Sequence, residues 1–105
     1  MAIYVDFVKI TFKGYQWCHM LADTLQELHE FAALIDVDAR LFHRHASYPH
    51  YDITVQMREI AIAQGAIPAD RKKIIECAKK LKVELNDQLM RFELSEQCFS
   101  LRNLF

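Results

Sequence analysis

The pattern of hydrophobic and polar positions predicts strands at the start of the chain. Residues 2–8 are rich in β-branched and aromatic side chains that alternate with polar positions, as in a half-buried strand. Gly14 marks a turn, and residues 15–22 form a second segment of the same kind. We therefore expect the chain to open with a hairpin-like pair of strands.

A first helix is expected directly after these strands. Thr24 and Glu27 have the spacing of a capping box, in which the two side chains reciprocally satisfy backbone N–H groups at a helix start. Residues 25–35 then place apolar side chains at helical spacing, which predicts a helix with one buried face. Residues 36–51 show neither the helical nor the strand period, and we expect them to be irregular.

A second helix is expected over about residues 55–64. Asp52 or Thr54 would cap it, and Gly65 stands in the usual position just beyond a helix end. The run at 60–63 is apolar on all sides, which indicates a buried helix.

The last third of the chain is expected to be mainly helical. A short edge strand at 66–67 would precede a third helix over about residues 68–82. From Val83 onward the pattern is ambiguous, and a fourth helix over 86–92 is one interpretation of it. Together the elements predict an α/β (α+β) fold in a small single domain, residues 1–105, with short N-terminal strands and three to four helices packed on them.

Length and composition exclude several classes of protein. A chain of 105 residues, 52% hydrophobic and 26% charged, can bury one core and is too short for two. Its three cysteines are far apart and form no CxxC pair, which is typical of reduced thiols in the cytoplasm. No segment approaches the roughly 18 apolar residues of a membrane span, and the N-terminus lacks the pattern of a signal peptide. The net charge of −1 gives no general attraction to nucleic acid or membranes, so we expect a cytoplasmic protein.

The histidines are concentrated in the first half of the chain. All five lie between positions 19 and 50: His19, His29, His43, His45 and His50. The two at 43 and 45 flank Arg44 in the segment expected to be irregular, and we expect them to be solvated.

Imidazoles and carboxylates from this region could bind one divalent metal ion, for which Mn, Zn and Mg are the candidates. His50 and Asp52 are two residues apart, so an extended backbone would point both to the same side. His19 ends a predicted strand, and Asp23 follows in the turn before the first helix. The best-defined hypothesis is a metal site formed by these four residues. The same residues would alternatively be core histidines and helix caps, or a metal-free acid–base set.

Five further residues complete the hypothesis. Asp6 or His29 would act as the catalytic base or would orient a metal ligand. Tyr51 and Arg58 would bind an anionic substrate oxygen, and Trp17 would form an apolar or stacking wall. For His29, the alternative is a residue at the boundary of the apolar helix face, with a backbone or water partner.

Two features of the second half indicate binding to macromolecules. Six basic residues in helix 71–82 could neutralise phosphates of a nucleic acid, or could form the solvated face of an amphipathic helix: Arg71, Lys72, Lys73, Lys79, Lys80 and Lys82. The apolar tail Phe99–Phe105 would pack on the domain's own core, form a homodimer or contact a partner protein.

Several short motifs resemble a small bacterial and phage family known as domain of unknown function 4031. They are Tyr4-Val5-Asp6, Trp17-Cys18-His19, Ala22-Asp23, Glu27-Leu28-His29, Phe31-Ala32, Pro49-His50-Tyr51-Asp52, Arg58, Ala61 and Gly65-Ala66. The resemblance implies a shared structural unit within residues 1–66, followed by a variable helical part and apolar tail at 67–105. It implies no activity. Phe7 stands where the family often has a second acidic residue, which weakens a metal scheme with two carboxylates at the first strand.

Three functions follow from these observations, in order of preference. The first is a metal-dependent hydrolase or ligand-binding domain that acts on a phosphoester or nucleotide through the His/Asp set. The alternative is a non-enzymatic interaction module of phage or prophage type, an inhibitor or accessory of a host protein. The third is nucleic-acid binding through helix 71–82.

Overall fold

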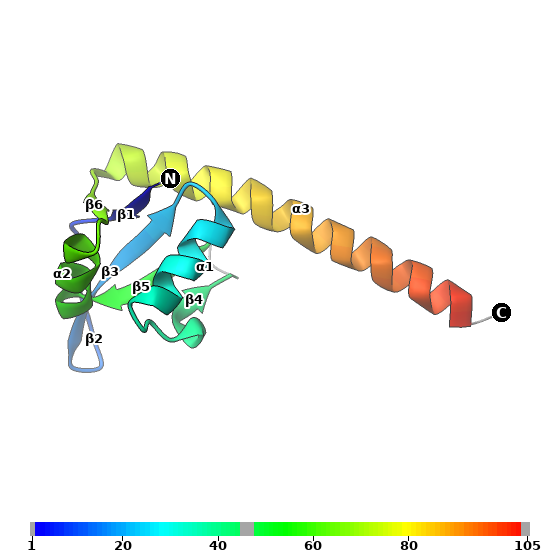
Figure 1. Ribbon diagram of the computed structural model, residues 1–105, viewed down its shortest axis with the longest axis horizontal. Helices are drawn as coiled ribbons and strands as arrows, with labels where there is room; N and C mark the ends of the chain where they lie inside the picture. The colour runs from blue at the N-terminus through cyan, green and yellow to red at the C-terminus, as the bar shows by residue number, and fades with distance from the viewer. Residues whose placement is uncertain (1, 45–47, 104–105) are drawn as a thin grey trace.

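A mixed β-sheet forms the centre of this computed structural model, which describes residues 2–44 and 48–103, with side chains up to Arg91 (Figure 1). In chain order the elements are β1 (Ile3–Val5), β2 (Ile10–Phe12), β3 (Tyr15–Ala22), α1 (Leu25–Leu34), the 3₁₀ turn η1 (Ala39–Leu41), β4 (Phe42–His43), β5 (His50–Thr54), α2 (Val55–Ala63), β6 (Ile67–Pro68) and α3 (Arg71–Asn103). The sheet has the order β4-β5-β3-β1-β6, and β2 pairs with β3 beyond this path. The expected small α+β domain is confirmed.

The N-terminal strands pair as expected, with an additional short strand between them. β1 and β3 are antiparallel, with Tyr4 opposite Leu21. The tight hairpin, however, joins β2 to β3 through Lys13 and Gly14, which both have positive φ (51° and 81°). Such a two-residue turn suits the right-handed twist of the flanking strands and favours glycine.

The caps of the first two helices follow the local sequence signals. The Thr24 hydroxyl accepts a hydrogen bond from the Glu27 N–H (3.2 Å), and the Thr54 hydroxyl accepts one from the Met57 N–H (3.1 Å). The expectation of a buried α2 is wrong: among its side chains only Ala61 is buried, and Ile60 is 48% exposed. Ala61 is buried and Met57 and Ile62 pack against the core as partly buried side chains, so only one side of α2 faces the rest of the domain.

Two other expectations about secondary structure are wrong. Residues 36–51 are not irregular throughout, because they contain η1, β4 and the first residues of β5. The third and fourth expected helices are one continuous helix, α3, which begins at Arg71 after Asp70 accepts a hydrogen bond from the Lys73 N–H (3.0 Å). Proline at position 68 lies in β6, not in the helix.

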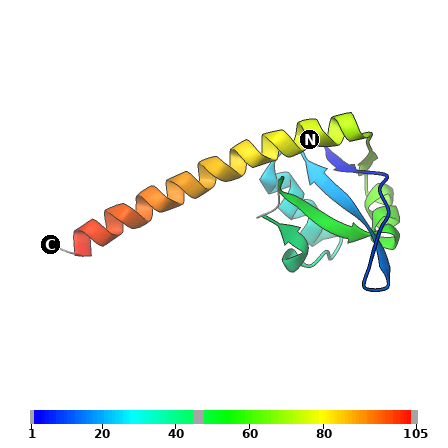
Figure 2. The same ribbon diagram turned by 180° about the vertical axis from the view of Figure 1, so that it is seen from behind.

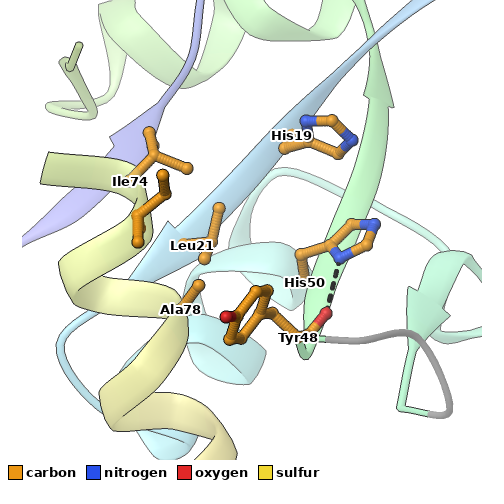
Figure 3. A pocket seen from close by; sticks show the side chains of 7 residues that line it. His19, Leu21, Tyr48, His50, Ile74 and Ala78 are labelled. Atoms are coloured by element: carbon orange, nitrogen blue, oxygen red, sulfur yellow. Dashed lines mark hydrogen bonds between the residues drawn. The ribbon is translucent and has the colours of Figure 1, made fainter. Parts of the chain in front are cut away.

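The two faces of the sheet are covered by different helices. Every second side chain of β3 and of β5 points to the face that α1 covers, and these side chains include Met20 and Tyr51. On this face Tyr51 contacts His29 of α1. The opposite face of the sheet carries the side chains of His19, Leu21 and His50. The first turns of α3 pack over the part of this face that contains Leu21 (Figure 3). His19 and His50 therefore lie on the part of this second face that α3 does not cover.

The later part of α3 projects away from the sheet (Figures 1 and 2). Leu81 and Leu85 are its last buried side chains among those described, and residues 86–91 are exposed. The predicted contacts of Phe99–Phe105 lie outside the described side chains. Within residues 2–44 and 48–103, no helix combines the length and apolar character that crossing a membrane requires.

Candidate metal centre

Strand register brings three histidines and one aspartate together on one face of the sheet. His19 of β3 lies directly opposite Asp52 of β5, and His43 of β4 lies opposite His50 of β5. Because side chains alternate along a strand, His50 and Asp52 point to the same face. We call these four residues the histidine–aspartate cluster.

The Asp52 carboxylate lies at the middle of the cluster. Its Oδ1 atom is 3.1 Å from His50 Nε2 and 3.9 Å from His19 Nε2. Its Oδ2 atom is 2.8 Å from His43 Nε2. The His19 and His50 rings meet edge to face, with centroids 4.7 Å apart, and the His43 ring stacks on His50. All three imidazoles thus direct the same ring nitrogen toward one carboxylate.

The other nitrogens of His19 and His50 are held by neighbouring groups. His19 Nδ1 donates to the Asp6 carboxylate at 2.6 Å, and His50 Nδ1 donates to the backbone carbonyl of Tyr48 at 2.8 Å (Figure 3). A neutral imidazole with a donating Nδ1–H has a free lone pair on Nε2. These two hydrogen bonds therefore fix both rings in the tautomer that binds a metal through Nε2.

Asp6 is itself firmly positioned. It is 6% exposed, and its second carboxylate oxygen accepts a hydrogen bond from the His19 backbone N–H (2.9 Å). Its backbone carbonyl accepts a hydrogen bond from Arg58 Nε (2.8 Å). A buried carboxylate with these contacts serves to orient His19 and does not face the open pockets.

The spacing of the cluster fits a small divalent ion. One ligand atom from each of His19, His50 and Asp52 lies within 4.8 Å of the other two. Ligand atoms that are roughly 2.0–2.1 Å from a tetrahedral zinc ion lie about 3.3 Å from one another. The N–O distances of 3.1 and 3.9 Å are close to this value, so small side-chain movements would complete the coordination.

Burial and charge affect the two anchored histidines differently. The hydrogen bond to Asp6 raises the pKa of His19, and partial burial opposes this change. Burial lowers the pKa of His50, which favours the neutral imidazole that a metal requires. On the opposite face, burial together with the charge of Asp6 raises the pKa of Cys18 to about 12, so this thiol remains protonated near neutral pH.

Two open pockets meet at His19 and His50. A pocket of about 440 Å³ lies on the side of β2 and η1, and Asp52, His43 and Trp17 are among its lining residues. A second pocket of about 330 Å³ lies between the sheet and α3, where Leu21, Ile74 and Ala78 form an apolar wall (Figure 3). We call these the hairpin pocket and the helix pocket. A metal ion at the cluster would be reachable from the hairpin pocket, which contains Asp52.

Asp23 does not join the cluster, although the sequence made it a candidate ligand. It follows the end of β3, four positions beyond His19, which corresponds to roughly 13 Å along a strand. Its carboxylate lies 4.0 Å from the thiol of Cys77 on α3. Neither Asp23 nor Asp52 is a helix cap, because Thr24 and Thr54 occupy those positions.

His29 and Tyr51 lie on the other face of the sheet. His29 Nδ1 is 2.7 Å from the Tyr51 hydroxyl, and both rings contact Phe42. Burial lowers the pKa of His29. The register of β5 explains this placement, because Tyr51 lies between His50 and Asp52 and must point away from them. Neither residue reaches the histidine–aspartate cluster.

Trp17 lies at the hairpin pocket, whereas Arg58 lies beside Asp6. The Trp17 ring lines the hairpin pocket, and its indole N–H donates to the Phe12 carbonyl (3.0 Å). Arg58 supports the backbone beside Asp6, with its guanidinium 4.9 Å from the Phe7 ring centroid. Its Nη2 atom is buried without a hydrogen-bond partner in the described part of the chain. Binding of an anionic oxygen by Arg58 remains a prediction.

The sequence reasoning missed His43. It was expected to be a solvated loop residue, but β4 places it against Asp52 with about half of its side chain exposed. The two-residue strand β4 has no recognisable local pattern, and only pairing with β5 positions it. His45 lies outside the described residues.

A family model matches most of the chain. The family is described as a protein of unknown function, DUF4031, and the match covers residues 3–81. It extends past residue 66, so it includes the first part of α3 as well as the whole sheet. No curated protein and no solved structure matches the chain.

Proposed function

The chain belongs to the DUF4031 family of proteins of unknown function, and from the geometry of its histidine–aspartate cluster we propose that it is a metal-dependent phosphoester hydrolase. The observation that supports this most directly is the convergence of one ligand atom each from His19, His50 and Asp52 within 4.8 Å of one another, with the Nε2 atoms of His19 and His50 3.9 and 3.1 Å from Asp52 Oδ1. Three protein ligands with a fourth position for water are the usual arrangement in catalytic zinc sites.

The donor set favours zinc or manganese over magnesium. Magnesium prefers oxygen ligands and retains several waters, whereas the two imidazoles suit zinc and the carboxylate is a ligand that manganese also accepts. The hydrogen bonds from His19 to Asp6 and from His50 to Tyr48 resemble the outer contacts that commonly orient metal-binding histidines.

In this proposal His43 would accept a proton from the attacking water. Its Nε2 lies beside Asp52 Oδ2, and its half-exposed ring lines the hairpin pocket. A divalent ion held by His19, His50 and Asp52 would supply the acidity that this water needs near neutral pH. The water oxygen would bond to phosphorus as the ester P–O bond breaks, and His43 would return the proton to the leaving oxygen.

The hairpin pocket has suitable groups for a phosphoester. Its volume of about 440 Å³ is in the range of small-ligand sites. Arg40 lines the edge of this pocket, and its guanidinium forms an ion pair with Asp38, with Nη2 2.7 Å from Oδ2. Trp17 and Phe12 form an apolar wall, against which a flat organic group would pack.

Metal binding is the first experiment. The chelator-treated full chain is titrated with zinc chloride in a calorimeter, and we expect one ion per chain. Asp52→Asn and His50→Ala should abolish binding, and Asp6→Asn should weaken it by about 10- to 100-fold because His19 loses its orienting partner. Asp23→Asn is the matched control and should bind zinc as the unsubstituted chain does.

Hydrolysis of bis(p-nitrophenyl) phosphate by the zinc- or manganese-loaded protein is the second readout. His43→Gln should retain the metal and lose most of the rate. The proposal is wrong if the folded protein binds neither ion, or if His50→Ala binds zinc as tightly as the unsubstituted chain.

A further inference from the structure

An exposed apolar surface adjoins the proposed metal centre. We call it the hairpin surface, and its members are exposed side chains from the segment that leads into the β2–β3 hairpin: Phe7, Val8, Ile10, Phe12 and Tyr15. Phe12 and Tyr15 are 59% and 57% exposed. The hairpin extends beyond the rest of the sheet, at the end away from the projecting part of α3 (Figures 1 and 2). Phe12 and Tyr15 lie directly opposite each other in the hairpin, and exposed apolar side chains grouped in this way indicate a binding site.

The hairpin surface continues into the hairpin pocket. Ile10, Phe12 and Trp17 line that pocket on one side, and the histidine–aspartate cluster lines it on the other. The Tyr15 and Trp17 rings meet edge to face, with centroids 6.0 Å apart, which extends the aromatic surface from the turn to the pocket. A ligand lying on these rings would therefore reach the proposed metal ion.

The charge of this segment is positive. Residues 7–22 include Lys9 and Lys13 and contain no aspartate or glutamate. The Lys13 ammonium lies 5.3 Å from the Phe12 ring centroid, so a positive charge stands directly beside an exposed aromatic face. Aromatic faces with adjacent cations suit a ligand that has flat rings and negative charges.

We propose that the hairpin surface binds single-stranded nucleic acid and presents one of its phosphodiesters to the metal centre. Bases would stack on Phe12 and Tyr15, and Lys9 and Lys13 would neutralise the adjacent phosphates. The presentation step rests on the proposed function, but binding by the hairpin does not need a metal. Double-stranded nucleic acid fits less well, because the faces of its bases are already covered by neighbouring pairs.

A second copy of the chain is a less suitable occupant. Pairing two hairpin surfaces would place Lys9 and Lys13 of both copies close together with no carboxylate in residues 7–22 to compensate them. Like charges in an interface oppose association. Nucleic acid, in contrast, supplies the missing negative charge.

Binding of a fluorescein-labelled dT12 oligonucleotide tests the proposal. Fluorescence anisotropy is measured with the full chain in EDTA, so the result is independent of any metal. Phe12→Ser and Tyr15→Ser should each weaken binding by about ten-fold, and Tyr15→Phe should retain it. Two neutralised phosphates predict that affinity falls about seven-fold between 50 and 200 mM salt.

Matched variants locate the binding surface. Leu34→Ser removes an apolar side chain of α1 that is even more exposed (69%) than Phe12 and should leave dT12 binding unchanged. The double variant Lys79→Glu, Lys80→Glu reverses charges on α3 and should have a much smaller effect than Lys9→Glu with Lys13→Glu. A duplex of the same length should bind more weakly than dT12.

Three results would overturn the inference: no binding of dT12 at 50 mM salt, equal losses in the Leu34 and Phe12 variants, or loss of binding only in the α3 variant. A dimer that dissociates on Phe12→Ser, with no dT12 binding, would assign the surface to self-association. None of these results affects the zinc titration, so the two proposals fail separately.

Discussion

At the scale of single residues, alternation along β5 decides which side chains can act together. His50 and Asp52 point to one face, and Tyr51 between them points to the other, where it meets His29. Two residues with similar chemistry, His19 and His29, thus have different roles. His19 belongs to the candidate metal centre, and His29 forms a polar contact at the edge of the core under α1.

The His29 contact predicts part of the pH dependence of stability. Burial, and the charge of Arg44, lower the pKa of His29 in the folded state, while Glu84 opposes them. The neutral ring is therefore favoured in the folded protein. Its contribution to stability is fully present above the unfolded pKa of about 6.5 and is lost as the pH falls through the lowered folded pKa.

Urea unfolding at pH 7.5 and at pH 5 measures this effect. The unsubstituted chain should lose more stability between the two values than His29→Gln, because glutamine does not titrate and can still bond the Tyr51 hydroxyl. Equal losses in both proteins would contradict the assignment.

At the scale of elements, the junction between β5 and α2 connects the fold to the site. Thr54 is both the last residue of β5 and the cap of α2, so no loop separates them. Because threonine serves as the cap, Asp52 stays in the strand with its carboxylate directed to the histidines. One turn into α2, Arg58 donates to the carbonyl of Asp6 and thereby supports the group that orients His19.

Removal of this cap should destabilise the protein. Thr54→Ala leaves the Met57 N–H without its acceptor and should lower the free energy of unfolding by about 1 kcal/mol. Urea denaturation followed by circular dichroism measures the difference. Thr11→Ala on exposed β2 is the matched control and should change the stability by less than about 0.5 kcal/mol. A smaller loss for Thr54→Ala than for Thr11→Ala would show that the cap is unimportant.

At the scale of the whole molecule, α3 has two different parts. Its first turns pack on the sheet through Cys77, Ala78 and Leu81. Its basic side chains at 71, 72, 79, 80 and 82 are exposed, as the solvated face of an amphipathic helix would be. The later part extends away from the sheet with Leu89 and Met90 exposed (Figure 2). An isolated helix with exposed apolar side chains is marginally stable in water, which favours a partner for this part.

We therefore expect the chain to self-associate through the later part of α3. Sedimentation equilibrium should show a monomer–dimer equilibrium that Leu89→Glu with Met90→Glu shifts toward monomer, by at least about ten-fold in the dissociation constant. Leu34→Glu on α1 is the control and should leave the equilibrium unchanged. A protein that is monomeric at all concentrations would contradict this expectation.

Local signals in the sequence were sufficient for the starts of α1 and α2 and for the turn at Gly14. The capping threonines act over three residues, and glycine with positive φ depends only on its own backbone, so neighbouring residues determine both. The same local reasoning identified His19, His50 and Asp52 as related polar residues. It failed for β4 and for the length of α3, which depend on pairing and packing with distant segments.

The sequence by itself determined the residue types available for a metal site and the spacing that puts His50 and Asp52 on one side of a strand. Only the tertiary structure decided that β5 lies between β3 and β4, which places His19 and His43 beside Asp52 and leaves Asp23 near Cys77. The physical reason is that strand order and register arise from long-range hydrogen bonding and burial of a whole sheet face. No short window of residues specifies them.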